Sequence, residues 1–317
     1  MEKSIPWPEK YRPNNIEDIM LDKQVEQQIK IFLQDRENVH LIITGLPGLG
    51  KTSTVRCIAK KMLGENINEG YLELNAAEDR GVRSISSIIP KFCKKMVNFT
   101  GSKIILLDEA DNMTSKCQCD INNMIKEFGR KTKFIFTCND STKIIEDIQS
   151  ICHIIRFKKL SDEQISSYLI KICKNEKVEY NNNGLSTICY ISNGDMRKAI
   201  INLQTTAFTY RKITKDNVLK ICKVPDPEEI NCIIKLCMSQ KLEEANQELE
   251  KIISQGYNFM DIINGFIYVL SNSNMDEFLK LQLIDIINNT KIAISKGLRS
   301  RLQLCAMVCR IIKVIIS

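Results

Sequence analysis

The chain has 317 residues, of which 44% are hydrophobic and 26% charged, and its formal net charge is +7. This length predicts two or three domains with sizeable cores, and the share of charged residues is typical of a soluble globular protein. No apolar run approaches the ~18 residues of a membrane span, and the first residues lack the apolar stretch of a signal peptide. We therefore expect no membrane partner, and the diffuse surplus of lysine is compatible with a polyanionic one.

The cysteines predict a compartment and exclude one class of site. Thirteen cysteines without an export signal predict reduced thiols inside a cell. Cys117 and Cys119 form a close pair, but no second pair or nearby histidine completes a zinc-binding pattern. Cys305 and Cys309 lie four residues apart in an apolar stretch, so we expect both in a helix core.

The N-terminal segment, residues 1–18, is rich in proline and also holds Trp7 and Tyr11. Proline fixes its own backbone and restricts the residue before it, which predicts an extended arm instead of a regular helix. The two aromatic residues indicate that this arm packs on another part of the protein.

A glycine-rich stretch, residues 45–52, follows the apolar run 41–43 and precedes a helical pattern over 54–63. A strand, a glycine-rich turn and a helix are the context of a phosphate-binding loop, in which Lys51 can reach the β- and γ-phosphates and Thr52 can bind Mg²⁺. Backbone N–H groups and the helix N-terminus would surround the phosphate oxygens. The loop residues of this predicted nucleotide site are Gly45, Leu46, Pro47, Gly48, Leu49, Gly50, Lys51, Thr52 and Ser53.

Two later strand patterns end in polar residues that suit phosphoryl transfer. The pattern 104–107 ends in Asp108 and Glu109. Beside a phosphate loop, Asp108 can hold Mg²⁺ through water, and Glu109 can polarise the attacking water. The pattern 134–137 leads to Asn139, whose amide would lie near the γ-phosphate. These residues predict an NTPase, and a GTPase is disfavoured because no NKxD sequence follows.

The order of the patterns predicts the fold class. Strand patterns recur at 41–43, 71–74, 104–107, 134–136 and 154–157, with helical stretches between them. This alternation is typical of a parallel sheet with crossover helices. After Leu160 the strand patterns stop, and a capping box of Ser161 and Gln164 begins a series of helices.

A second boundary lies at Asp226, which can cap a helix whose first turn accepts Pro227. Beyond it, helical patterns cover 228–239, 242–254, 259–270, 276–288 and 291–314. We therefore predict an α/β chain with an ATPase core over 1–160, a helical lid over 161–224 and an all-α domain over 225–317.

Further short sequences carry a family resemblance. They are Glu9–Pro13, Glu73–Ala76, Asp79–Gly81, Asp108–Asp111, Ile144–Ser150, Gly194–Arg197 and Asn202–Gln204. With the phosphate loop and Asn139, they make the chain similar to AAA+ ATPases. Within that class it resembles the small subunits of replication factor C, the eukaryotic sliding-clamp loader, and above all the 40-kilodalton subunit of animals. The resemblance covers about residues 6–222, and the remainder is similar only as a helical collar domain.

The resemblance implies a P-loop AAA+ parallel-sheet domain followed by a helical lid and an all-α collar. It implies one subunit of a heteropentameric ring that uses ATP and Mg²⁺ and is weakly active or inactive alone. The implied partners are the other replication factor C subunits, a sliding clamp and primer–template DNA. The implied processes are DNA replication and DNA repair, and the implied location is the nucleus.

The same resemblance assigns site residues. Asn139 would be the first sensor and Arg197, in the lid, the second, both at the γ-phosphate. Asp79–Gly81 would lie near the nucleotide and the DNA-facing helix. Pro8, Arg12 and Met20 would line the adenine pocket. Catalysis would then depend on Lys51, Asp108, Glu109, Asn139 and Arg197.

The chain departs from the family at an inter-subunit face. Ile151 stands where family members carry an arginine that reaches the ATP site of the neighbouring subunit, and such a finger supplies about 10³–10⁵ in rate in related reactions. Arg156 lies in the next strand pattern, so we do not expect it to substitute. Asn122 and Asn123 stand where the family usually has paired arginines. We expect that this subunit does not activate its neighbour in the usual way.

The helix after Gly81 departs as well. Ser86 and Ile88 replace basic residues that the family turns toward DNA, and we expect Pro90 to kink or end this helix. The remaining candidates for contacts with DNA phosphates, which follow the backbone without recognising sequence, are Arg83, Lys91, Lys94 and Lys95.

Two other interpretations remain open. The chain could be an ATP-binding structural subunit of the ring with little hydrolysis of its own, although the presence of both Lys51 and Glu109 favours turnover. It could also be a homohexameric AAA+ remodeller, but Ile151 would then disable every interface.

Overall fold

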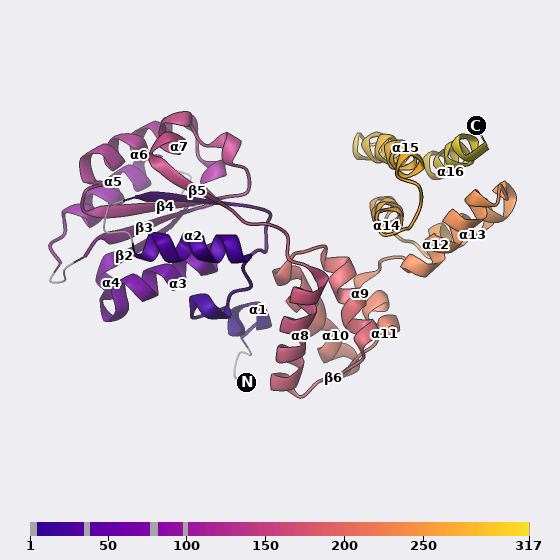
Figure 1. Ribbon diagram of the computed structural model, residues 1–317, viewed down its shortest axis with the longest axis horizontal. Coiled ribbons are helices and arrows are strands. Elements are labelled where there is room, and N and C mark those ends of the chain that lie inside the picture. Colours follow the sequence, from indigo (N-terminus) through magenta and orange to yellow (C-terminus); the bar gives the residue numbers. More distant parts are fainter. Residues whose placement is uncertain (1–4, 35–38, 77–81, 98–100, 317) are drawn as a thin grey trace. The chain divides into compact units, whose positions relative to one another are not determined.

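The computed structural model describes residues 5–34, 39–76, 82–97 and 101–316, and within these it describes only the backbone of residues 82–86. The chain divides into two compact units, Met1–Arg211 and Lys212–Ser317. Figure 1 shows the helices and strands of both units, coloured along the sequence. In the part of the chain that is described, no helix is long and apolar enough to cross a membrane.

A five-stranded parallel sheet forms the centre of unit 1 (Figure 1). Its strands, in the spatial order β2-β3-β4-β1-β5, are β1 (His40–Thr44), β2 (Tyr71–Asn75), β3 (Lys103–Asp108), β4 (Thr132–Cys138) and β5 (Cys152–Arg156). β4 lies between β1 and β3, with Thr44 opposite Cys138 and Leu107 opposite Phe136. The carboxyl ends of these three strands therefore meet at one edge of the sheet, as predicted.

Alternate residues of the central strands pack on opposite faces, because successive side chains of a strand point to opposite sides. Leu41 and Ile43 join one buried cluster with residues of two helices, whereas Ile42 joins a second cluster with residues of three others. The first face is covered by α2 (Lys23–Gln34) and α3 (Lys51–Leu63), and the second by α5 (Val82–Lys94), α6 (Ser115–Phe128) and α7 (Glu146–Ile151). Figure 1 shows these two helical layers.

The remainder of unit 1 is helical except for a two-residue strand. It comprises α1 (Trp7–Lys10), α4 (Ile67–Gly70), α8 (Asp162–Glu176), β6 (Glu179–Tyr180), α9 (Asn182–Ser192) and α10 (Met196–Tyr210), with 3₁₀ turns at Ile16–Asp18, Gly64–Asn66, Ala110–Asn112 and Ser141–Lys143. The predicted capping box is confirmed, because the Gln164 N–H donates to Ser161 Oγ at 3.2 Å and the Ser161 N–H donates to Gln164 Oε1 at 3.0 Å.

Unit 2 starts with a two-residue strand and continues with helices around its own core. Its elements are β7 (Lys212–Ile213), α11 (Lys215–Cys222), α12 (Pro227–Met238), α13 (Leu242–Ser254), α14 (Phe259–Ser271), α15 (Glu277–Ser295) and α16 (Arg301–Ile316). Ile233, Phe266, Ile287 and Met307 are fully buried in that core. The predicted cap of α12 is confirmed, since Asp226 accepts from the Glu228 N–H at 2.9 Å.

One prediction about proline was wrong, and one of the two effects expected of Pro90, the end of the helix, is excluded. Residues 7–10 form the one-turn helix α1: the Pro6 carbonyl accepts from the Glu9 and Lys10 N–H groups at 2.9 Å, and Pro8 lies in the first turn, where a proline removes no intrahelical hydrogen bond. Pro90 does not end α5, which continues to Lys94. A proline inside a helix removes one hydrogen bond, and here packing of the neighbouring Ile89, which is fully buried, holds the helix together.

Two predictions for the last two helices were wrong: the boundary between the helices, and the burial of one cysteine. The helix expected to end at residue 288 continues to Ser295. Thr290 is buried and its hydroxyl donates to the Ile286 carbonyl at 3.0 Å, so the helix passes through the asparagines and stops before Gly297, whose φ is 102°. Cys309 is exposed and not in the core, and Cys305 is partly buried. The short strands β6 and β7 also lie beyond Leu160, where no strand was expected.

Candidate functional site

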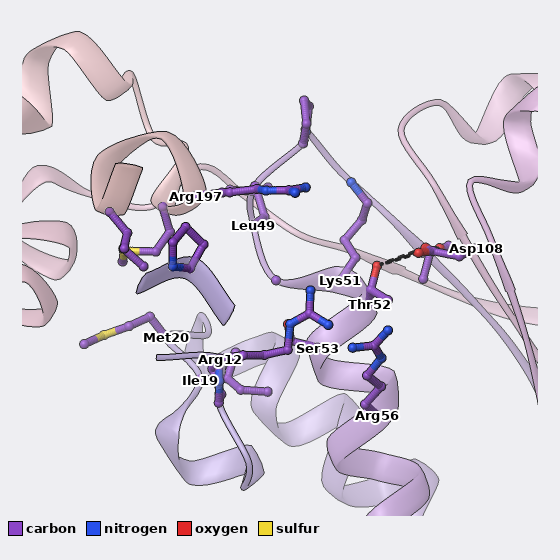
Figure 2. A pocket seen from close by; sticks show the side chains of 18 of the residues that line it. Arg12, Ile19, Met20, Leu49, Lys51, Thr52, Ser53, Arg56, Asp108 and Arg197 are labelled. Carbon is purple, nitrogen blue, oxygen red and sulfur yellow. Dashed lines mark hydrogen bonds between the residues drawn. The ribbon is translucent and has the colours of Figure 1, made fainter. Parts of the chain in front are cut away.

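A cavity of about 830 Å³ lies in unit 1 at the carboxyl edge of the sheet, and Figure 2 shows its lining. This volume is within the range of about 300–1,000 Å³ typical of small-molecule sites. Its walls come from the N-terminal arm, the phosphate loop, the ends of β2, β3 and β4, and helices α3, α8 and α10. It is the place at which an open α/β sheet with crossover helices usually binds its ligand.

The phosphate loop connects β1 to α3 and has a conformation that depends on glycine. Gly48 has a φ of 74° and Gly50 a φ of 83°, which is the left-handed region that other residues rarely adopt. A Cβ atom on Gly48 would also lie 1.8 Å from Asp195 Oδ1, the residue that caps α10. Only glycine therefore fits this position, and the backbone of the loop stays open toward the cavity.

Lys51 connects the loop to the end of β4. Its Nζ donates to Asn139 Oδ1 at 2.9 Å and to the carbonyls of Gly45 and Leu46 at 2.6 and 2.9 Å. Burial lowers the pKa of Lys51, although the carboxylates of Asp111, Asp108 and Glu109 and the Cys138 thiol partly offset this effect. An ammonium group held only by neutral oxygens can exchange them for phosphate oxygens.

Thr52 and Asp108 form the second polar pair of the cavity. Thr52 Oγ1 lies 2.9 Å from Asp108 Oδ1 and 3.0 Å from Oδ2, and the Thr137 hydroxyl also donates to Asp108 Oδ1. A hydroxyl and a carboxylate are hard oxygen ligands of the kind that Mg²⁺ prefers. The donor set therefore fits this ion.

Glu109 and Arg197 lie at the more exposed side of the cavity. Glu109 has a φ of 54°, its N–H donates to Thr137 Oγ1 at 3.3 Å, and its Oε2 accepts from Asn112 Nδ2 at 3.2 Å. Arg197 is exposed in the first turn of α10. Figure 2 shows its side chain extending toward the loop that carries Leu49. Both side chains can approach a ligand without the loss of a buried contact.

The opposite end of the cavity is mainly apolar. Figure 2 shows Ile19 and Met20 on the side away from Asp108, and Pro8, Met196 and Ile200 are further apolar residues of the lining. An apolar surface of this kind can accept a flat heterocyclic base, whereas Lys51, Thr52 and Asp108 at the other end can bind phosphate oxygens or Mg²⁺. The cavity is therefore divided into a base end and a phosphate end.

The structure places most of the expected nucleotide residues along this cavity. Gly45 and Leu46 do not line it, and they act through the carbonyls that hold Lys51. The lining includes Pro8, Arg12, Met20, Pro47, Gly48, Leu49, Gly50, Lys51, Thr52, Ser53, Asp108, Glu109, Asn139 and Arg197.

The polar lining residues that sequence reasoning missed include Arg56, Glu73, Thr137 and Tyr168. Arg56 makes a bidentate ion pair with Glu73, with N–O distances of 2.8 and 2.7 Å. Helical spacing could have indicated Arg56, which lies four residues after Thr52 and on the same side of α3. No sequence signal pointed to Tyr168, which comes from a distant helix.

The residues expected to contact DNA gather near the end of α5. Lys91, Lys94 and Lys95 are exposed, and Lys94 Nζ lies 5.9 Å from the centre of the Phe128 ring. The side chain of Arg83 and the segment Asp79–Gly81 lie outside the described residues. The three lysines therefore form a small positive surface, which can contact a phosphate backbone without selecting a sequence.

Ile151, Asn122 and Asn123 are the positions at which the chain departs from the inter-subunit residues of the family it resembles. Ile151 ends α7 and is 38% exposed, so its side chain offers neither charge nor hydrogen bond to the outside. Asn122 is only 4% exposed and its Nδ2 donates to Asp147 Oδ2 at 3.2 Å, so its side chain is engaged within this chain. Asn123 is exposed. Asn122 thus joins α6 to α7.

Comparison with known protein families matches three successive parts of the chain. The model of the AAA family, ATPases associated with various cellular activities, matches residues 41–160. An AAA+ ATPase lid domain of the RCF1/5-like type matches residues 167–208, and the replication factor C C-terminal domain matches residues 225–310.

Full-length relatives decide the family. A replication factor C small subunit of Acanthamoeba polyphaga mimivirus is 69% identical over 99% of this chain and 98% of its own length. Replication factor C subunit 4 of Saccharomyces cerevisiae is 38% identical over 98% of this chain and 96% of its own, and that of Schizosaccharomyces pombe is 36% identical over 98% and 91%. This chain belongs to the replication factor C small-subunit family. The family confirms the expected AAA+ ATPase subunit of a clamp loader.

Solved structures share the fold of this replication factor C subunit at low sequence identity. The Holliday junction branch migration motor RuvB of Thermotoga maritima has a TM-score of 0.56 and 16% identity, over 76% of this chain and 85% of that one. The likeness confirms the predicted AAA+ fold.

Proposed function

We propose that this replication factor C subunit binds ATP with Mg²⁺ in the cavity of unit 1 and hydrolyses it within a heteropentameric clamp-loading ring. The observation that carries the proposal is the convergence of polar groups from two strand ends and from the start of α3. Lys51 lies 2.9 Å from Asn139, and Thr52 lies 2.9 Å from Asp108. Each of these residues has a distinct task in phosphoryl transfer.

The phosphate end would bind and orient the triphosphate. The Lys51 ammonium would exchange the loop carbonyls for β- and γ-phosphate oxygens, and the Asn139 amide would fix its direction. Thr52 and, through water, Asp108 would hold Mg²⁺, which neutralises phosphate charge when bound. Glu109 would accept a hydrogen bond from the attacking water, and Arg197 would donate to the γ-phosphate.

The base end would orient the adenine. The apolar side chains of Pro8 and Met20, together with Ile19, offer a ring-sized surface, while Arg12 lies on the same wall. This division of the cavity supports a nucleoside triphosphate over inorganic phosphate alone, since the base adds apolar contact area.

The partners proposed for the ring are other replication factor C subunits, a sliding clamp and primer–template DNA, with the complex acting in the nucleus. Lys91, Lys94 and Lys95 would contribute contacts to the DNA backbone. At the face with Ile151, the chain would not supply a charged group to the ATP site of its neighbour. The domain boundaries 1–160, 161–224 and 225–317 would correspond to ATPase core, lid and collar.

Nucleotide binding is tested by titration calorimetry of ATP with the full-length chain, with and without Mg²⁺. Lys51→Ala should weaken ATP binding more than about 100-fold, because it removes the cation at the triphosphate. Thr52→Ala should remove most of the difference in ATP affinity between titrations with and without Mg²⁺. The control is Lys60→Ala, which changes an exposed lysine of the same helix. Equal affinities of the wild type and Lys51→Ala would contradict the proposed site.

Assembly is tested by native mass spectrometry of the tagged protein purified from its own cells with ATP and Mg²⁺. One complex of five different AAA+ chains, with this chain present once, is the expected result. A homo-oligomer or a lone monomer would contradict the proposed ring. If the assembled ring shows no loss of ATPase activity when Lys51 is replaced by alanine, the chain is an ATP-binding structural subunit.

A further inference from the structure

The first described residues of the chain form an arm, residues 5–13, that packs on helix α10. Trp7 is only 5% exposed, and its ring lies 5.7 Å from the ring of Phe208. The backbone N–H of Trp7 donates to Gln204 Oε1 at 3.0 Å. The contacts with α10 therefore determine where the beginning of the arm lies.

Glu176, the last residue of α8, holds the next part of the arm. Its Oε1 accepts from Lys10 Nζ and from the Tyr11 hydroxyl, each at 2.6 Å. Burial raises the pKa of Glu176, but the bonds from Lys10 and Tyr11 outweigh burial and the net pKa is lowered. Tyr168 of the same helix donates to the Tyr11 carbonyl at 2.7 Å. One ionised carboxylate thus binds two successive arm residues to α8.

The other side of the arm belongs to the cavity. Pro8, Tyr11 and Arg12 line it, whereas Glu176 lies outside the lining. The Pro13 carbonyl accepts from the Cys57 thiol of α3 at 3.4 Å. The arm is therefore bonded to α8 before Arg12 and to the helix of the phosphate loop after it. Figure 2 shows Arg12 extending toward the start of α3.

We propose that Glu176 is a positioning residue for the nucleotide, because it sets the arm as the wall of the base end. The inference rests on the proposed nucleotide site. Among the described residues, the hydrogen bonds of Lys51 and Thr52 at the phosphate end run to the loop carbonyls, to Asn139 and to Asp108, and not to the arm. Glu176 consequently governs contact with the base and sugar, and leaves contact with the phosphates unaffected.

The test compares ATP with inorganic tripolyphosphate, which lacks the base, by calorimetric titration of the full-length chain. Glu176→Ala should weaken ATP binding about tenfold, the order expected for a lost charge-assisted hydrogen bond, and leave tripolyphosphate binding unchanged. Glu176→Gln keeps an oxygen that accepts from Tyr11 and should recover most of the ATP affinity. Glu163→Ala, at an exposed position in the first turn of α8, is the matched control.

Two outcomes would overturn the inference. An equal loss for ATP and tripolyphosphate would show that Glu176 only supports the fold, and unchanged binding of both would show that the arm does not depend on it. A wild-type chain that binds neither ligand would refute the proposed nucleotide site itself, so the two failures are distinguishable.

The single tryptophan of the chain gives an independent measurement. Without nucleotide, Glu176→Ala should move the emission of Trp7 to longer wavelength, because a loosened arm exposes the indole to water. Glu176→Gln should restore most of the wild-type spectrum. Emission that is identical in Glu176→Ala and the wild type would contradict the anchoring of the arm by Glu176.

Discussion

The two ends of the central strands in unit 1 carry different polar residues. At the carboxyl ends, Asp108 and Asn139 are accessible to the cavity and bond the phosphate loop. At or near the amino ends, His40, Lys103 and Lys133 are at most 7% exposed. His40 and Lys103 are hydrogen-bonded, as Asp108 and Asn139 are, but Asp108 and Asn139 line the cavity and can exchange their partners for a ligand.

The amino edge shows how buried basic groups stabilise the domain. Lys103 Nζ donates to the carbonyls of Phe92, Cys93 and Lys95 at 2.7, 3.0 and 2.5 Å, so it caps the end of α5. Ile151 lies at the same edge, immediately before β5. The comparison predicts that changes at the carboxyl edge affect turnover, whereas changes at the amino edge affect folding or the neighbouring subunit.

The largest expected effect is at the carboxyl edge. Glu109→Gln should lower ATP turnover in this site about 10³-fold, because it removes the base that orients the attacking water. ATP affinity should stay within about twofold, since Lys51 and Thr52 are retained. The measurement is single-turnover hydrolysis by the assembled ring, with Glu146→Gln, an exposed change on α7, as control. Unchanged turnover would remove the distinction between the two edges.

Lys103→Met should lower the free energy of unfolding of unit 1 by about 3 kcal/mol, because three carbonyls at the end of α5 lose a charged donor. Denaturant titration followed by Trp7 emission measures this unit, which holds the only tryptophan. Lys131→Met, at an exposed position, is the control. A large loss of ATP affinity in folded Lys103→Met would show that the amino edge also serves the nucleotide.

His40 should make unit 1 sensitive to acid. Burial and the nearby Lys133 lower its pKa from 6.5 to about 4, and its Nδ1 accepts from the Phe134 N–H at 3.2 Å. The unfolded chain therefore binds a proton at a higher pH than the folded chain, and stability is lost as the pH falls from 6.5 toward 4.

Between pH 7 and pH 5, the wild type should lose about 2 kcal/mol more unfolding free energy than His40→Gln does. The exposed His153 provides the control substitution His153→Gln, which should behave like the wild type. The same pH dependence in wild type and His40→Gln would contradict a neutral buried imidazole.

The smallest expected effect concerns Ile151. Ile151→Arg should raise the ATPase rate of the assembled ring about tenfold at most, because a new guanidinium reaches the neighbouring site without the support that a native finger has. Ile151→Met, which adds no charge, should have no effect. An unchanged rate in Ile151→Arg would show that this face does not act on a neighbouring ATP site.

Much of the sheet and its carboxyl edge could be predicted, because local signals determine them. Strand alternation places Asp108 and Asn139 at the ends of β3 and β4, and the glycine pattern marks the loop between β1 and α3. Functional residues at the ends of strands can thus be predicted from the sequence.

The packing of the arm was expected from its aromatic residues, but its partners, its one-turn helix and the buried edge could not be predicted, because tertiary packing determines them. Nothing around Trp7 indicates that a one-turn helix would pack on Phe208, and nothing around Asn122 indicates its contact with Asp147. Glu176 and Tyr168 similarly gain their importance only from the arm that they hold. The partners in these contacts lie from 25 to more than 160 residues apart in the sequence, so no local periodicity indicates them.

The structure around Gly48 restricts which amino-acid substitutions this protein can accept during evolution. Its backbone conformation and the close approach of Asp195 both exclude a side chain, so two separate constraints act on one codon. Asp195 in turn caps α10 through the Lys198 N–H at 2.9 Å, which limits its own replacement. Gly48 belongs to the phosphate-loop motif, which is a local sequence pattern. Its replacement is nevertheless also restricted by Asp195, a residue of a helix far away in the sequence.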